Sequence, residues 1–179
     1  MHIIGIIIAI ATAIFWVSRA ARGARDVADA ANTLRNMPRR MHFKNEAGKR
    51  GLDLIDTPME AATILMVSIA KLSDYAAAHD GLLSGSSTSR IITTLKSYMR
   101  ISAVEADELL TQMRWTVKDL TQPDTALAPM TNILSGAINR AEADDLSDML
   151  RKISHADGDP NPEQRAFIAR VRERLGLEV

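Results

Sequence analysis

Residues 153–163 read ISHADGDPNPE and mark a place where one helix ends and another begins. Asp157 and Gly158 form a dipeptide typical of tight turns. After the turn, Asn161 can cap the next helix and Pro162 suits its first position. Gly176 is a typical helix stop. The stretch therefore predicts a helix, a tight acidic turn and a second helix.

A weaker copy of this unit lies earlier in the chain. Asp80-Gly81 precedes Asp157-Gly158 by 77 residues, and the same offset places Ile91 on Ile168 and Tyr98 on Leu175. We interpret this match as an internal duplication of a helix, turn and helix. The first copy has lost its oxygen-rich character, because Ser84 and Ser86 stand where the second has the amide of Asn161 and the carboxylate of Glu163.

The composition favours a single all-α domain. Hydrophobic residues make up 46% of the 179 residues but aromatic residues only 4%, and no segment alternates with the period of a strand. The absence of cysteine excludes disulfides, thiolate ligands and iron–sulfur clusters. Because 22 basic and 22 acidic residues balance, no general nucleic-acid surface is indicated.

Residues 52–179 are expected to form one helical domain, in which six amphipathic helices joined by short loops make a compact bundle. Three of them begin at capping boxes, Thr57/Glu60, Ser102/Glu105 and Asn139/Glu142. We expect the first helix to reach about residue 78, residues 81–87 to form a flexible loop, and Pro123 and Pro129 to bracket a break before the fourth helix. Met113 and Trp115 are expected in the core or a groove.

Residues 3–17 (IIGIIIAIATAIFWV) contain no charged side chain and predict a transmembrane anchor spanning residues 1–18. The isoleucine, phenylalanine and valine residues favour insertion by roughly 3 to 5 kcal/mol. A cleaved signal peptide would carry its basic residues before the apolar run, whereas here they follow it. A buried core helix is the remaining alternative for this segment.

Residues 19–51 are interpreted as a polar helix followed by a basic linker. The basic residues that follow the apolar run place the C-terminal part in the cytoplasm, in a single-pass protein of the inner membrane with its N-terminus outside. Contact with anionic lipid head groups is predicted for Arg19, Arg22, Arg25, Arg39 and Arg40. A solvated linker is an equally good interpretation of the segment from residue 39 to residue 50.

The acidic turn is the strongest candidate for a binding site. Alternate oxygen-bearing side chains at Asp157, Asp159, Asn161 and Glu163 can converge on a hard cation such as calcium or magnesium. The spacing is not that of an EF-hand. The alternative is a structural turn whose carboxylates cap the helix that follows it and favour its positive end.

No catalytic set is visible, and we expect a protein that is not an enzyme. Residues 81–87 (GLLSGSS) resemble a phosphate loop only superficially, because no lysine follows the second glycine and no strand precedes the first. The four histidines are scattered and form neither a triad order nor a zinc-protease motif.

The two Asp-Gly turns, the helix start after Asp56-Thr57-Pro58 and the ending from His155 to Leu177 resemble the tellurite-resistance TerB and TerB-like family. The resemblance covers about residues 52–177. It implies an all-helical domain of two related halves, acidic residues proposed to bind metal, and a role in membrane-associated stress responses. It adds Asp80 as the first-half counterpart of Asp157, whereas Ser86 replaces an expected acidic residue and reduces the expectation to one site.

Two functional hypotheses follow. The first is a membrane-anchored, non-enzymatic TerB-like module on the cytoplasmic face, which binds a protein partner in the membrane and responds to a metal. The second is an accessory or assembly subunit of a larger membrane complex, in which the acidic turn is purely structural.

Overall fold

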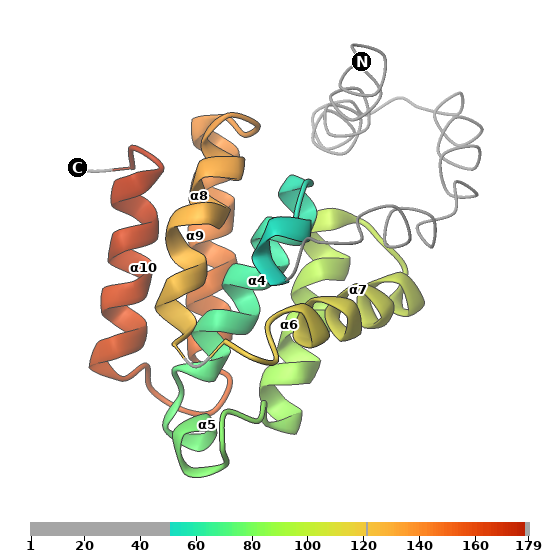
Figure 1. Ribbon diagram of the computed structural model, residues 1–179, viewed down its shortest axis with the longest axis vertical. Helices are drawn as coiled ribbons and strands as arrows, with labels where there is room; N and C mark the ends of the chain where they lie inside the picture. The colour runs from blue at the N-terminus through green and yellow to red at the C-terminus, as the bar shows by residue number, and fades with distance from the viewer. Residues whose placement is uncertain (1–50, 121, 178–179) are drawn as a thin grey trace. The chain divides into compact units, whose positions relative to one another are not determined.

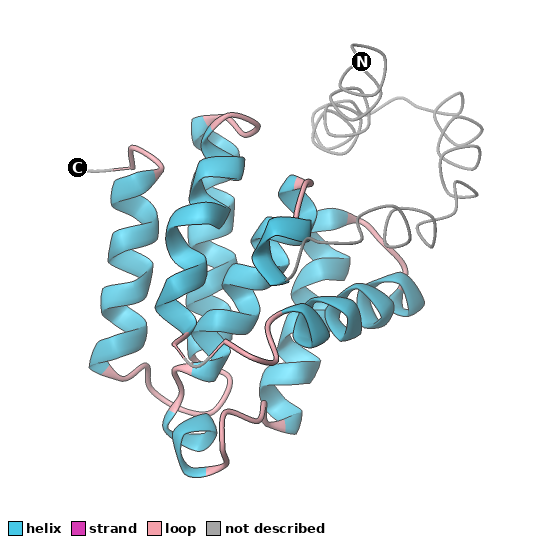
Figure 2. Ribbon diagram, in the orientation of Figure 1, coloured by secondary structure: helices cyan, strands magenta, loops and turns pink. Residues whose placement is uncertain are grey.

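The computed structural model describes residues 51–120 and 122–177. The chain divides into two units, Met1–Leu54 and Ile55–Val179, and only the 3-10 helix η1 (Gly51–Leu54) is described in the first. The second unit is built from seven α-helices and one further 3-10 helix, and no strand occurs among the described residues (Figure 2). The all-α prediction is therefore confirmed.

Helix α4 (Pro58–Lys71) is the centre of the second unit (Figure 1). It packs against all five of the longer helices α6 to α10. Its sequence explains this position, because apolar and small residues surround the helix and eleven of its residues are buried. The predicted capping box is present, with Thr57 accepting from the backbone N–H of Glu60 and Glu60 accepting from that of Thr57.

The other elements surround α4. In chain order they are α5 (Asp74–Ala78), α6 (Gly85–Met99), α7 (Ala103–Thr116), η2 (Pro123–Ala126), α8 (Leu127–Ser135), α9 (Arg140–Ser154) and α10 (Pro162–Arg174). Helix α10 packs against both α8 and α9, and α6 packs against both α7 and α9 (Figure 1). Capping boxes at Ser102 and Asn139 begin α7 and α9 as predicted.

Three predicted boundaries were wrong. The first helix ends at Lys71, and Ser73 caps the separate short helix α5. The segment expected to be a loop up to residue 87 is already helical from Gly85, because the Ser84 hydroxyl caps α6. Pro129 lies inside the first turn of α8 rather than before it, and a missing N–H costs nothing there because the first N–H groups of a helix have no intrahelical partner.

The end of α10 confirms the predicted stop at Gly176. This residue has φ of 70°, which glycine adopts without a steric penalty. Its N–H donates to Glu173 O at 3.0 Å, and the N–H of Leu177 donates to Arg172 O at 2.9 Å. These two bonds form a Schellman motif, and Leu177 is buried after it.

The predicted transmembrane anchor and basic linker lie outside the described residues. Within the part of the chain that the structure describes, no helix is both long and apolar enough to cross a bilayer.

Candidate functional site

The acidic turn connects α9 to α10. Its first residue, His155, is the C-cap of α9, and its Nδ1 lies 2.8 Å from Arg151 O. Gly158 has φ of 131°, so the turn needs a residue without Cβ at this position. Asn161 ends the turn and caps α10, since its side-chain oxygen accepts from the N–H of Gln164 at 2.9 Å.

The carboxylate of Asp157 binds the start of α6 rather than that of α10. Ser84 and Ser87 both donate their hydroxyl groups to it, Ser87 at 2.8 Å. Ser84 is also the N-cap of α6, with its oxygen accepting from the Ser87 N–H at 2.8 Å. A negative charge is favoured at this end of a helix. The second acidic turn therefore bonds to the first half of the domain.

Two further side chains of the second half bond to the end of α4. The Nδ2 of Asn161 donates to Leu72 O at 2.7 Å and to Asp74 Oδ1 at 2.8 Å. The Nε2 of Gln164 donates to Ile69 O at 3.1 Å, and this side chain is only 3% exposed. We call the contacts of Asp157, Asn161 and Gln164 with the first half the turn joint.

The turn joint agrees with an internal duplication. Ser84 and Asn161 coincide at the offset of 77 residues, and each is the N-cap of a helix. The residues three positions later, Ser87 and Gln164, both bond to the opposite half. The repeated turn thus brings two equivalent helix starts into one contact region.

The five residues predicted to bind a metal are not grouped around one point. Asp157 and Asn161 bond to the first half, whereas Asp159 and Glu163 are exposed. Asp80 lies in the left-handed region with φ of 51° and faces a different cleft. Within residues 51–120 and 122–177, no three histidine, aspartate or glutamate side chains are placed to hold one ion. The metal site stays a prediction that would require the turn to rearrange.

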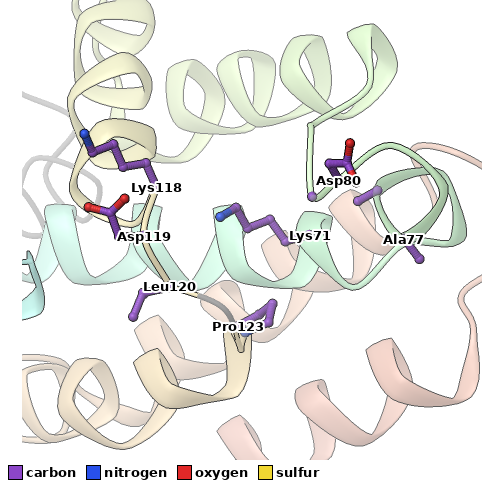
Figure 3. Close-up of a pocket in the computed structure, with 9 residues that line it drawn as sticks. Lys71, Ala77, Asp80, Lys118, Asp119, Leu120 and Pro123 are labelled. Atoms are coloured by element: carbon purple, nitrogen blue, oxygen red, sulfur yellow. The ribbon is translucent and has the colours of Figure 1, made fainter.

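The cleft next to Asp80 lies between the α4–α5 junction and the segment after α7 (Figure 3). Its volume is about 390 Å³. Lys71 donates to Val117 O at 3.1 Å there and so links the ends of α4 and α7. Burial lowers the pKa of the Lys71 ammonium, and Arg114 lowers it further, whereas the carboxylate of Asp119 raises it.

One aromatic residue is placed differently from the sequence expectation. Met113 is buried as expected, but Trp115 is 59% exposed on α7. The Nζ of Lys118 lies 5.2 Å from the centroid of the Trp115 ring, within the range of a cation–π interaction. The indole is therefore available on the surface.

Several residues of the turn joint were not recognised as functional in the sequence. Ser87, Gln164 and Asp74 form its long-range bonds, and they lie 70 to 95 residues from their partners. The repeat offset was the available signal, because it aligned Ser84 with Asn161, which was predicted to be a helix cap. It did not indicate that the caps would meet.

Comparison with known proteins agrees with this architecture. A family model described as tellurite resistance protein TerB matches residues 61–179, which include α5 to α10 and most of α4. No curated protein and no solved structure shows a significant match to the chain. Because the family model covers well over half of the sequence, the chain belongs to the TerB family of tellurite resistance proteins.

Proposed function

We propose that this chain is a membrane-anchored, non-enzymatic TerB module on the cytoplasmic face of the inner membrane, which binds a protein partner and responds to a divalent cation. The observation that carries the proposal is the position of Asp157. Asp157 is exposed, yet its carboxylate accepts hydrogen bonds from two serine hydroxyls at the start of α6. A cation that binds this carboxylate competes with Ser84 and Ser87.

The competition provides a mechanism for a response. Calcium and magnesium prefer carboxylate oxygens, and Asp159 and Glu163 offer two more on the same exposed turn. If Asp157 turns toward an ion, its two bonds to α6 are lost and the turn joint loosens. The ion would therefore change how the two halves of the domain contact each other.

Calorimetric titration of the full chain with calcium and with magnesium tests the metal response. We expect a saturable heat that disappears in Asp157→Asn and in Glu163→Gln. The control is Asp148→Asn, an exposed carboxylate of α9 that pairs with Arg151 at 2.7 Å. The absence of a saturable heat, or a heat that both turn variants retain, would remove the metal from the proposal.

Membrane fractionation tests the anchor separately. Two aspartates in residues 3–17, Ile7→Asp with Ile10→Asp, cost about 5 to 7 kcal/mol at the bilayer centre and exceed the roughly 3 to 5 kcal/mol that favours insertion. We expect this variant to leave the alkali-washed membrane fraction, and we expect Val104→Asp, at an exposed position of α7, to remain in it. Release of both proteins, or of neither, would contradict the proposed anchor.

A second candidate is an accessory or assembly subunit of a membrane complex, with a purely structural turn. It is favoured by Val104 and Trp115, which are 67% and 59% exposed. They lie eleven residues apart, about three turns, on one face of α7.

Purification of the tagged full chain in mild detergent distinguishes the second candidate. We expect a stoichiometric partner that is retained by Asp157→Asn and lost in Trp115→Ser with Val104→Ser. Recovery of the chain alone from native membranes would count against it.

A further inference from the structure

No side chain that lines the cleft beside Lys71 forms a hydrogen bond of the turn joint. Its lining comes from the end of α4, from α5 and its following turn, from residues 118–120 after α7, and from the first residue of η2 (Figure 3). The lining residues comprise two lysines, two aspartates and five small or apolar residues, namely Lys71, Lys118, Asp80, Asp119, Ala76, Ala77, Gly81, Leu120 and Pro123. A volume of about 390 Å³ is within the range of small-molecule sites.

The positive charge of Lys71 is only partly stabilised by the residues of the cleft. Its ammonium has three donors, and the bond to Val117 O uses one of them. Burial and the nearby Arg114 both disfavour the charged form and lower the pKa of Lys71, and the opposing effect of Asp119 is smaller. An anion bound at Lys71 would therefore supply stabilisation that the unliganded cleft lacks.

The rest of the lining restricts which anion fits. Ala77, Leu120 and Pro123 offer an apolar surface to the body of a ligand, and Ala76 is fully buried behind it. Asp80 and Asp119 place negative charge in the same cleft, which disfavours a ligand with two or more negative charges. A single carboxylate on a short apolar chain satisfies both conditions.

We infer that this cleft is a binding site for a small organic monocarboxylate, with its carboxylate on the Lys71 ammonium and its hydrocarbon part against Ala77, Leu120 and Pro123. Lys118 borders the same cleft and reaches over the Trp115 ring, so it adds positive charge at the rim. Asp80 lines this cleft, but the turn residues of the proposed metal response, Asp157, Asp159 and Glu163, do not, and neither Lys71 nor Lys118 takes part in the turn joint.

Saturation-transfer NMR on butyrate, with the full chain in nonionic detergent, tests the inference. We expect saturable transfer to the butyrate methyl group, with affinity weakened at least tenfold in Lys71→Met. The matched control is Lys96→Met, which removes an exposed lysine from the last turn of α6 and should bind as the unaltered protein does. Butanol and inorganic phosphate should compete much less well than valerate, because one lacks the charge and the other carries too much.

A second variant tests the cleft without touching the lysine. Ala77 is an exposed residue of α5 that lines the cleft, and Ala77→Leu should block butyrate while circular dichroism shows an intact helical fold. The inference is overturned if transfer does not saturate, if Lys96→Met weakens it as much as Lys71→Met, or if phosphate competes as well as valerate. Unaltered butyrate binding in a folded Ala77→Leu protein would overturn it as well.

Discussion

Replacing Asp157 with alanine should weaken the contact between the two halves of the domain. The substitution removes the acceptor of the Ser84 and Ser87 hydroxyls, and these residues are only 6% and 1% exposed. A net hydrogen bond contributes about 0.5 to 1.5 kcal/mol, so two bonds give a loss of about 1 to 3 kcal/mol in the free energy of unfolding. Ser84 still caps α6 in the variant, so the helix start itself should persist.

Urea unfolding of the unit Ile55–Val179, followed by circular dichroism at 222 nm, measures this loss. Asp159→Ala is the matched control, because it removes an exposed carboxylate of the same turn and should change stability by no more than about 0.5 kcal/mol. A double-mutant cycle with Ser87→Ala should give a coupling energy of about 0.5 to 1.5 kcal/mol, since the two side chains bond directly.

The comparison of Asp157→Ala with Asp159→Ala and the coupling energy to Ser87 together test whether the turn joint holds α6. If Asp157→Ala loses no more stability than Asp159→Ala, or if its coupling to Ser87 is zero within error, the turn joint does not hold α6. A changed dependence on urea concentration would instead indicate that the unfolded or native state has become more or less compact.

Three further predictions concern the joint, the core and the cleft. Gln164→Ala should cost about 1 to 3 kcal/mol in urea unfolding, because it removes two hydrogen bonds, from Nε2 to Ile69 O and from the Asn161 N–H to Oε1, and exposed Glu163→Gln should cost less than about 0.5 kcal/mol. Phe167→Ala should cost about 3 to 5 kcal/mol in the same assay, since the ring is fully buried, and a loss below about 1 kcal/mol would contradict its place in the core. Because the pKa of Lys71 is lowered in the folded state, the unfolded chain binds more protons between that pKa and about 10.4, and stability should rise with pH across this window relative to Lys71→Met. Parallel pH dependence of the two proteins would refute the lowered pKa.

Local signals in the sequence predicted many helix ends correctly. The capping boxes at Thr57, Ser102 and Asn139 and the stop at Gly176 were recognised because each motif lies within a few residues. The start of α6 was missed because Ser84 is one of several serines and threonines in the same stretch. Only one of these residues could be the N-cap of α6, and the local sequence pattern did not indicate which one.

The burial of residues was predictable where a single stripe faces the core. Leu146, Met149, Leu150 and Ile153 of α9 are buried as their spacing indicated. Trp115 was not, because a large aromatic residue next to a basic one fits a core, a groove or a surface equally well. Its exposure depends on which helices pack beside α7.

The sequence by itself determined the helical class, the family and the identity of the acidic turn, because these depend on composition and on motifs shorter than about a dozen residues. The tertiary structure alone decided what the turn contacts. The sequence left Asp157 as either a metal ligand or a carboxylate at the positive end of the helix that follows it, and in the structure it binds the start of α6, where Ser87 lies 70 residues earlier in the chain. Such a partner is set by how α9 and α10 pack around α4, and that packing has no local signature.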